Sequence, residues 1–382
     1  MKKILFVTSL YLFPPFWGGG QRTYNLLKSL GNNFEVYFLC PMKDQLGASK
    51  QLEKKYRKEL KKLGIKIFTY HSLININHLL VKYINPEIIV KGLELILTKK
   101  IDLIICDYPW SGINVLILHF LTGVPFIFHE HNIEYLIKDE IRAKYGKLMK
   151  ILEKILCKKA KIIITVSQKD KNILSKVFKI PKKKIWVVEN GFDETRFYPN
   201  NKNVEKIRRK YKIGKNPLII FFGKLDYPPN KEAVYKIYWE ILPRVLKILP
   251  QAKFLIVGKK YPFEFKPRKE LIFTGLVKNI EDYVNAADIV IVPLRVGSGT
   301  RIKILESIAC GKKIVSTSKG AEGLINKLTK PFLFIADDWD RFCELIVEKL
   351  SNYSPPKPSS SFFKKYSWKQ IGEKLVQKLK KI

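Results

Sequence analysis

The sequence predicts an α/β protein with two Rossmann-like, doubly wound parallel-sheet domains. Short apolar runs alternate with helical stretches in two successive series along the chain, and this alternation is typical of parallel βαβ units. A length of 382 residues allows two domains of ordinary size. The clearest single unit is 288–320, where a buried strand, a glycine turn, a helix and another strand follow in order.

We expect an N-terminal domain at 1–198, a C-terminal domain at 199–360 and a last helix at 361–382. Apolar runs place the strands of the first domain at 4–10, 36–39, 65–69, 103–106, 125–128, 161–167 and 186–188. Those of the second domain are expected at 218–223, 254–258, 271–274, 289–292 and 314–316. Helices are expected at 23–30, 231–249, from 280, and at 302–310.

The net charge of +37 is the most unusual feature of the composition. A hydrophobic content of 46% excludes a disordered chain. Attraction to nucleic acid or to an anionic membrane would explain the charge. A compositional bias is the competing explanation, because Lys, Ile and Asn are abundant along the whole chain. Charge alone therefore does not decide the partner.

Two lysine-dense stretches have apolar residues at helical spacing. The stretch 50–66 suits membrane attachment and packing on a sheet equally well. For 138–161 we favour core packing of one apolar stripe, which contains Ile141, Leu148, Leu152, Ile155 and Leu156. We expect the stretch 50–66 to attach the protein reversibly to an anionic membrane surface.

Five scattered cysteines without metal-ligand spacing argue against a disulfide framework and against a zinc site. The apolar start lacks a small-residue cleavage site, and the apolar stretch 115–128 is too short to span a bilayer. We therefore expect a cytoplasmic protein, with peripheral attachment to the inner face of the cell membrane as an open alternative.

The helix expected at 302–310 has cations at its start. Arg301 and Lys303 occupy its first turn, where the helix dipole is already positive and acids are favoured. Each such placement costs only about 0.3–1 kcal/mol, so an awkward surface helix is an alternative. Two cations beside free N–H groups and a glycine loop would, however, hold a diphosphate. We favour the anion site.

The run GSGTRIKILESIACG, followed by IVSTSKGAEG, resembles the donor-site motif of GT-B glycosyltransferases, particularly the retaining family GT4. The resemblance implies that Glu306 binds the ribose hydroxyls of a nucleotide-sugar. It also implies that Arg301 and Lys303 stabilise the departing diphosphate during catalysis. The family often has a second glutamate eight residues before the first, which contacts the sugar, but here that position is Ser298. The donor group is Ser298, Gly299, Thr300, Arg301, Lys303 and Glu306.

Other segments extend the resemblance, which also implies that the two domains face a cleft and that the last helix, at 361–382, crosses back to the N-terminal domain. In HEHNIEY, the pair His131–Asn132 matches the family's histidine at the end of a strand, so His131 is the candidate for touching the transferred sugar. His129 is the reserve, and ENGFDETRFYP matches the family's close of the N-terminal domain. The positions that match donor-binding residues elsewhere in the family are Gly19, Gly20, Arg22, Lys224, Gly275 and Val277.

The resemblance implies a retaining transferase that uses a UDP-, GDP- or ADP-sugar and a glycan or lipid-linked acceptor, in cell-surface polysaccharide or glycoconjugate synthesis. No metal ion is expected to be required, because the cations would neutralise the phosphates. Two histidines alone are a poor metal site. Asp338-Trp339-Asp340 spells the DxD of metal-dependent GT-A enzymes, but these acids are ordinary at the start of a helix.

Other functions fit the sequence less well. A nucleotide-sugar epimerase or a phosphorylase has the same fold, and neither a catalytic carboxylate pair nor a pyridoxal-phosphate lysine can be identified here. A basic nucleic-acid-binding protein would use the charge, but no reader motif or aromatic stacking platform is found, so no nucleic acid is expected. A nicotinamide dehydrogenase would need GxGxxG after the first strand, which is absent.

Overall fold

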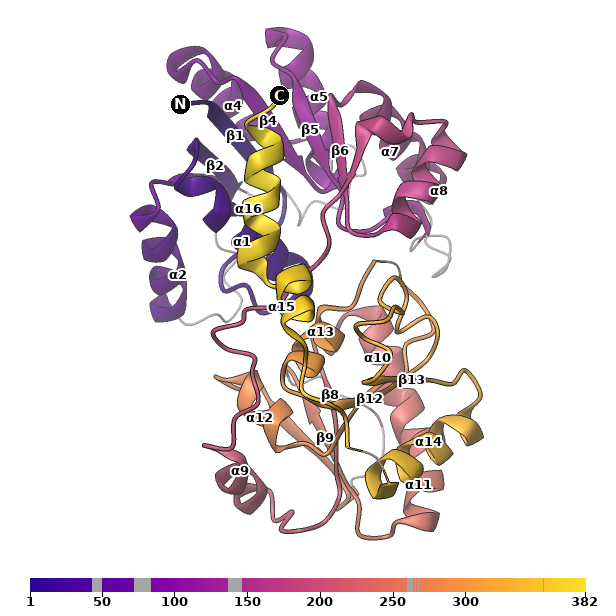
Figure 1. The fold of residues 1–382 in the computed structure, drawn as a ribbon. Coiled ribbons are helices and arrows are strands. Elements are labelled where there is room, and N and C mark those ends of the chain that lie inside the picture. The colour runs from indigo at the N-terminus through magenta and orange to yellow at the C-terminus, as the bar shows by residue number, and fades with distance from the viewer. Residues whose placement is uncertain are drawn as a thin grey trace. The chain divides into compact units, whose positions relative to one another are not determined.

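The computed structural model describes residues 1–42, 50–71, 84–136, 146–259, 264, 266, 268–297, 299–352 and 354–382. These residues divide into two compact units, one formed by 1–189 with 371–382 and the other by 190–370 (Figure 1). Each unit contains a parallel sheet with its own helices. The predicted pair of Rossmann-like domains is confirmed.

The sheet of the first unit has the strand order β3-β2-β1-β4-β5-β6-β7 among the described residues. Every neighbouring pair is parallel. Side chains along β1 are almost fully buried because helices cover both faces of such a sheet. The strands are β1 (Lys3–Thr8), β2 (Glu35–Pro41), β3 (Lys66–Tyr70), β4 (Leu103–Asp107), β5 (Phe126–His129), β6 (Ile162–Thr165) and β7 (Ile185–Val187).

The helices of this unit lie on opposite faces of its sheet. Right-handed crossovers place α1 and α2 on one face, and α4, α5, α7 and α8 on the other. The last helix, α16, packs beside α1, where a Cβ built on Gly372 would lie 1.8 Å from Ser29 Oγ (Figure 1). The helices are α1 (Gly18–Gly31), α2 (Lys50–Lys62), α4 (Pro86–Lys99), α5 (Gly112–Thr122), α7 (Gly146–Lys159), α8 (Gln168–Phe178) and α16 (Trp368–Leu379), with short turns η1 (Pro109–Ser111) and η2 (Lys182–Lys184).

The second unit has a parallel sheet in the order β10-β9-β8-β11-β12-β13 over the described part of the chain. Its strands are β8 (Leu218–Phe222), β9 (Lys253–Val257), β10 (Leu271–Gly275), β11 (Ile289–Val292), β12 (Lys313–Ser316) and β13 (Leu333–Ile335), the last of which the sequence analysis did not predict. Its helices are α9 (Val204–Lys210), α10 (Pro228–Lys236), the π-helical segment η3 (Ile237–Ile241), α11 (Leu242–Ile248), α12 (Ile280–Ala286), α13 (Ile302–Ala309), α14 (Trp339–Asn352) and α15 (Ser360–Tyr366).

The C-terminal segment differs from the single helix expected at 361–382. It forms α15 and α16, which are separated at Ser367. Phe192 donates its N–H to the carbonyl of Tyr366 at 3.0 Å and accepts the N–H of Trp368 at 3.1 Å. These two bonds replace helical ones, so the helix is interrupted there. Residues 190–198, which the sequence analysis assigned to the first domain, belong to the second unit because Phe192 and Phe197 lie in its core.

Candidate functional site

The second unit has a topological switch point between β8 and β11, because β9 and β10 extend the sheet on one side and β12 and β13 on the other. Ligands of open parallel sheets bind beyond the carboxyl ends of the strands at such a point. Two segments leave the sheet there, the turn after β8 and the loop 293–301 after β11, which leads into α13. The motif at 297–306 therefore occupies the position where this kind of sheet binds ligands.

The loop before α13 is held by side chains. The Asn190 side chain donates to the carbonyl of Thr300 at 3.1 Å and to its hydroxyl at 2.9 Å. Arg301 folds its guanidinium back, and Nη1 donates to the carbonyl of Gly299 at 2.8 Å. Gly299 has a φ of +77°, which glycine adopts without strain. The predicted residues Gly299, Thr300 and Arg301 are thus brought together; Ser298 lies outside the described residues.

Lys303 points from the first turn of α13 toward the end of β8. Its ammonium donates to Asn230 Oδ1 at 3.1 Å and lies 4.2 Å from the centre of the Phe221 ring. Burial and, to a lesser extent, the charge of Arg301 lower the pKa of Lys303 to about 7, while Glu306 opposes the shift. An incoming polyanion would favour the charged form of this ammonium. Lys303 is therefore suited to a phosphate group.

Glu306 is buried on α13, with 3% of its surface exposed, and its charge influences Lys303. A carboxylate is seldom buried to this extent unless it interacts with polar groups. The burial of Glu306 therefore indicates that its carboxylate binds polar groups. The structure brings Glu306 within electrostatic range of Lys303 and places it one turn along the helix, as the motif predicts.

The residues that were expected to bind the donor from neighbouring strands do not all lie near Lys303. The Lys224 side chain is 56% exposed and lies 4.0 Å from an oxygen of Asp226, while its carbonyl accepts the amide of Asn230 at 2.9 Å. Gly275 ends β10 with a φ of +72°. Val277 packs at the margin of the core. The Lys224 ammonium is thus not gathered with Lys303, whereas Asn230, which the sequence analysis did not include in the site, is.

A second polar cluster lies at the switch point of the first unit. Asp107 ends β4 beside β1, and His129 ends the neighbouring strand β5. One carboxylate oxygen of Asp107 lies 2.8 Å from His129 Nδ1 and 2.7 Å from His131 Nε2. The other oxygen accepts the Thr23 hydroxyl at 3.0 Å. All of these residues are buried.

The hydrogen bonds define the state of both histidines. Burial opposes ionisation of Asp107, but His131 and His129 outweigh it and hold its pKa below the usual range. An ionised carboxylate only accepts hydrogen bonds, so His129 Nδ1 and His131 Nε2 carry the protons. Burial lowers the pKa of His131, and burial together with His131 and Arg22 lowers that of His129 to about 3. Both rings are therefore neutral near pH 7, which leaves His131 Nδ1 as an acceptor.

Asp107, His129 and His131 form a group of three possible metal ligands, whereas the sequence offered only the two histidines. The observed distances of 2.7–2.8 Å from Asp107 to each ring are those of hydrogen bonds. His129 also accepts the N–H of the Arg22 guanidinium at its Nε2, at 2.8 Å, and a cation in contact with a ligand opposes a bound cation. These distances fit a hydrogen-bonded network better than a metal centre.

The glycines and the arginine of the predicted first loop have packing roles. Helix α1 begins at Gly18, so Gly19 and Gly20 lie in its first turn and not in the expected loop. A Cβ on Gly19 would lie 1.7 Å from the Tyr108 hydroxyl. Arg22 is 1% exposed and binds His129 and the carbonyl of Glu189. Burial lowers the pKa of Arg22 to about 10, so it stays charged and positions the histidine.

Residues that the sequence analysis missed support His131. Tyr108 stacks on its ring with centroids 3.8 Å apart. Glu153 of α7 accepts the N–H groups of Glu134 at 2.6 Å and Tyr135 at 3.1 Å, which anchors the segment after His131. Asp107 offered a usable signal, because it stands at the end of a predicted buried strand, as His129 does. No feature of the sequence marked Glu153 in the same way, since it is one acid within a lysine-rich helix.

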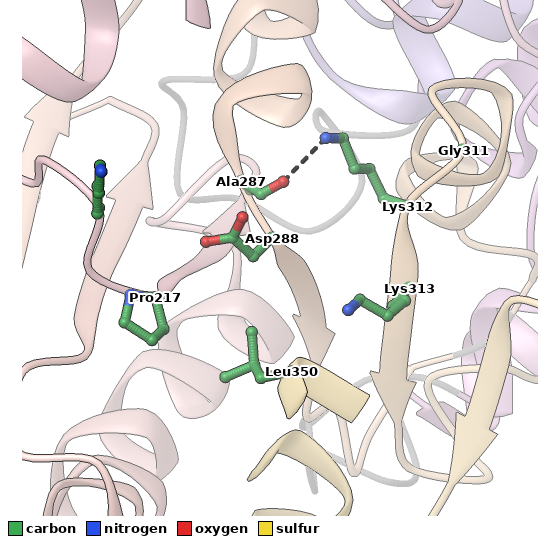
Figure 2. Close-up of a pocket in the computed structure, with 8 residues that line it drawn as sticks. Pro217, Ala287, Asp288, Gly311, Lys312, Lys313 and Leu350 are labelled. Atoms are coloured by element: carbon green, nitrogen blue, oxygen red, sulfur yellow. Dashed lines mark hydrogen bonds between the residues drawn. The ribbon is translucent and has the colours of Figure 1, made fainter. Parts of the chain in front are cut away.

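The hollow shown in Figure 2 is separate from these clusters. It measures about 360 Å³ and lies at the amino ends of β8, β11 and β12, at the opposite edge of that sheet from the start of α13. Two of its lysines, Lys312 and Lys313, donate hydrogen bonds to backbone carbonyls of the protein. Lys312 donates to the carbonyls of Asn285 at 2.6 Å and Ala287 at 2.9 Å, and Lys313 to that of Lys349. We assign no ligand to this hollow.

The chain is similar to known glycosyltransferases. Residues 17–196 match the family model described as Glycosyltransferase Family 4, and residues 216–352 match the one described as Glycosyl transferases group 1. An uncharacterized glycosyltransferase of Methanocaldococcus jannaschii is 22% identical over 342 residues, which are 82% of this chain and 84% of that protein. The Escherichia coli UDP-Gal:alpha-D-GlcNAc-diphosphoundecaprenol alpha-1,3-galactosyltransferase is 25% identical over 269 residues, 66% of this chain and 67% of its own.

Among solved structures, Anabaena HepE in complex with UDP and glucose is similar along the whole of both chains. The TM-score is 0.74 and the identity 16%. At this identity the likeness shows the fold alone, and that fold is GT-B.

Proposed function

Because this chain belongs to the GT4-like glycosyltransferases of the GT-B fold, we propose that it takes a nucleotide-sugar as donor and transfers the sugar with retention of anomeric configuration. One observation supports this most directly. Arg301, Lys303 and the N-terminus of α13 meet at the switch point of a parallel sheet, beside a buried glutamate. Such an arrangement suits a diphosphate with an attached ribose.

The cations of the donor site are placed to stabilise the negative charge that develops on the leaving phosphate during the reaction. As the bond between sugar and diphosphate breaks, negative charge grows on the leaving phosphate, and Lys303, Arg301 and the helix N–H groups stabilise it. Charge neutralisation by these cations makes a metal ion unnecessary. In the first unit, His131 presents Nδ1 as an acceptor for a hydroxyl of the transferred sugar. Asp107 fixes the tautomer that makes this possible.

The acceptor is proposed to be a glycan or a lipid-linked saccharide. The Escherichia coli relative acts on a diphosphoundecaprenol-linked sugar, according to its name, and HepE was crystallised with UDP and glucose. UDP-hexoses are therefore the first donors to examine, followed by GDP- and ADP-sugars. Synthesis of cell-surface polysaccharide or glycoconjugate, on the cytoplasmic side of the membrane, is the biological role that we propose.

The experiment is a donor screen by thermal shift and by slow hydrolysis of the donor, performed in EDTA. We expect one nucleotide class to stabilise the protein and its sugar to be released with retained configuration, which NMR of the product reports. Failure of every nucleotide-sugar to bind would overturn the donor assignment, and an inverted product would overturn retention. Activity that appears only after Mg²⁺ or Mn²⁺ is restored would overturn metal independence.

Glu306→Ala is expected to weaken nucleotide binding without unfolding the protein. A charged hydrogen bond to ribose is worth roughly 1.5–3 kcal/mol, so the Kd should rise roughly 10- to 150-fold. Calorimetry with the nucleoside diphosphate measures this change. Glu205→Ala, at an exposed acid of α9 in the same unit and outside the motif, is the control. Equal affinity of Glu306→Ala and the parent protein would remove Glu306 from the site.

Donor binding is expected to depend on pH through Lys303. Its pKa is about 7 in the empty protein because of burial and Arg301, and a bound diphosphate raises it. Binding therefore takes up a proton, so affinity is highest below pH 7 and falls by up to about tenfold per unit above it. Calorimetry with an intact nucleotide-sugar between pH 6 and 9 tests this, because its phosphates do not titrate there. Lys303→Arg keeps a permanent charge and should remove the dependence.

A further inference from the structure

Helix α7 has two apolar stripes, and only one of them faces the sheet. Met149, Leu152 and Leu156 are buried. Leu148 and Ile155, which the sequence analysis placed in the same packing stripe as Leu152 and Leu156, are exposed instead, and so is Ile151. The exposed fractions are 44% for Leu148, 56% for Ile151 and 42% for Ile155. Their spacing of three and four residues makes them one continuous stripe on the outer face.

Lysines flank this outer stripe. The acid of the helix, Glu153, is buried on the other side, where it accepts the N–H groups of residues 134 and 135. The outer face of α7 therefore combines three aliphatic side chains with cations and contains no acid. The exposed lysines of α7 are Lys147, Lys150, Lys154, Lys158 and Lys159.

The neighbouring helix α5 adds exposed apolar residues. Leu156 of α7 packs against α5 at Gly112, where a Cβ would lie 2.5 Å from a methyl group of Leu156. At its C-terminal end α5 exposes Phe120 by 87% and Leu121 by 57%. Both helices lie on the same face of the sheet and run antiparallel to its strands, so Phe120 and Leu121 lie toward the Lys158 end of α7.

We propose that the outer face of α7, together with the Phe120–Leu121 end of α5, is the surface by which this protein binds an anionic lipid membrane. Aliphatic and aromatic residues flanked by lysines are the composition of helices that lie in a bilayer interface. Lysines near an anionic surface add attraction that salt weakens. Membrane binding of this kind goes beyond the proposed transfer reaction and does not depend on the donor.

Other occupants match this surface less well. In a symmetric dimer formed through this face, the lysines of one copy would meet those of the other, and like charges oppose such contact. A nucleic acid would pair with the lysines, but its phosphates would then lie against Leu148, Ile151 and Ile155. A membrane has a partner for both kinds of side chain, with anionic headgroups for the lysines and acyl chains for the apolar residues.

Helix α2, where the sequence alone suggested membrane attachment, lies on the opposite face of the sheet and differs in composition. Its Leu60 is buried, and Leu52 and Tyr56 are partly buried, as is Leu63 directly after the helix, so that none of the described apolar residues of α2 is fully exposed. Arg57 pairs with Glu53 at 2.9 Å. Exposed lysines on α2 offer long-range attraction without apolar insertion. They are Lys54, Lys55, Lys58, Lys61 and Lys62.

Co-sedimentation with phosphatidylglycerol–phosphatidylcholine vesicles and with pure phosphatidylcholine vesicles, at low and high salt, tests this surface on the full chain. One variant replaces Leu148, Ile151 and Ile155 by serine. A second replaces the five exposed lysines of α7 by glutamine, and a third replaces the five lysines of α2, which removes the same charge. We expect the two α7 variants to bind anionic vesicles about tenfold more weakly than the parent protein, and the α2 variant to lose much less.

Folding is checked by circular dichroism and by an unchanged nucleotide thermal shift, since none of the replaced residues belongs to the donor site. If the two lysine variants lose equal affinity for anionic vesicles while the serine variant binds fully, the proposed surface is wrong. Net charge alone would then explain the binding. Indifference of the parent protein to anionic vesicles would also overturn it. Self-association of the parent protein that the serine variant abolishes, or tighter binding to duplex DNA than to vesicles, would assign the face to another partner.

Discussion

The double variant Arg301→Ala/Lys303→Met is expected to lose about 10²- to 10³-fold in kcat while its KM for the donor changes far less. In the proposed mechanism both cations act on the charge that grows on the leaving diphosphate, so they would stabilise the transition state more than the bound donor. Methionine keeps the contact of residue 303 with Phe221, which limits the change to the charge. Steady-state kinetics with the donor found by the screen measures both constants.

The stability of the same variant serves as its control. In the folded protein the pKa of Lys303 is about 7, below the ordinary value for lysine, so between pH 7 and the ordinary value the unfolded chain binds more protons. The parent protein therefore gains stability as pH rises through this window, and the buried charge opposes folding most below pH 7. The variant should melt at a higher temperature than the parent protein at pH 6, with a smaller difference at pH 9. Full activity of the double variant would end the hypothesis.

Asp107→Asn is expected to lower kcat about 10- to 100-fold with little change in nucleotide affinity, by analogy with the outer-shell partners of other functional histidines. The carboxylate of Asp107 accepts from Nε2 of His131 at 2.7 Å, and this leaves Nδ1 free of a proton. An asparagine amide can donate to Nε2 instead, and the proton then moves to Nδ1. His131 would present a donor where the sugar hydroxyl needs an acceptor.

Thr23→Val is the matched control for that variant. It removes a hydrogen bond to the other carboxylate oxygen of Asp107, at 3.0 Å, and leaves the bonds to both histidines. A merely structural role for Asp107 predicts similar losses in both variants, whereas tautomer control predicts a large loss only in Asp107→Asn. Nitrogen-15 NMR of His131 reports the tautomer directly. An unchanged tautomer with an unchanged rate would remove Asp107 from its positioning role.

The donor motif could be predicted from sequence because its parts are adjacent in the chain. Strand β11, the glycine loop and α13 follow within 288–310, so local periodicity and helix-end electrostatics were enough to single out Arg301 and Lys303, and the family resemblance added Glu306. The partners of Lys303 were not predictable in the same way. Asn230 and Phe221 reach it from β8 and the turn after it, and only the order of strands in the sheet makes β8 and β11 neighbours.

The cluster around His131 could also be predicted only in part. The sequence alone placed His129 and His131 after a strand, but Asp107 lies at the end of another strand, 22 residues before His129. The parallel register of β4 and β5 pairs Asp107 with His129, and this pairing assembles the network. Arg22, which the motif suggested for phosphate contact, is buried against His129 by the packing of α1.

Periodicity identified the apolar positions of α7 but could not assign them to the core or to solvent, since two stripes on one helix have the same spacing. Contact with α5 and the sheet buries Leu152 and Leu156 and leaves Ile151 exposed. The last helix is a comparable case, because helical propensity runs through Ser367. The break there comes from hydrogen bonds to Phe192, 175 residues earlier in the chain. Sequence alone located most of the strands, the helix α13 and the donor-type motif that leads into it. Tertiary packing decided which faces and which polar partners each segment has, because these depend on residues that are distant in the chain.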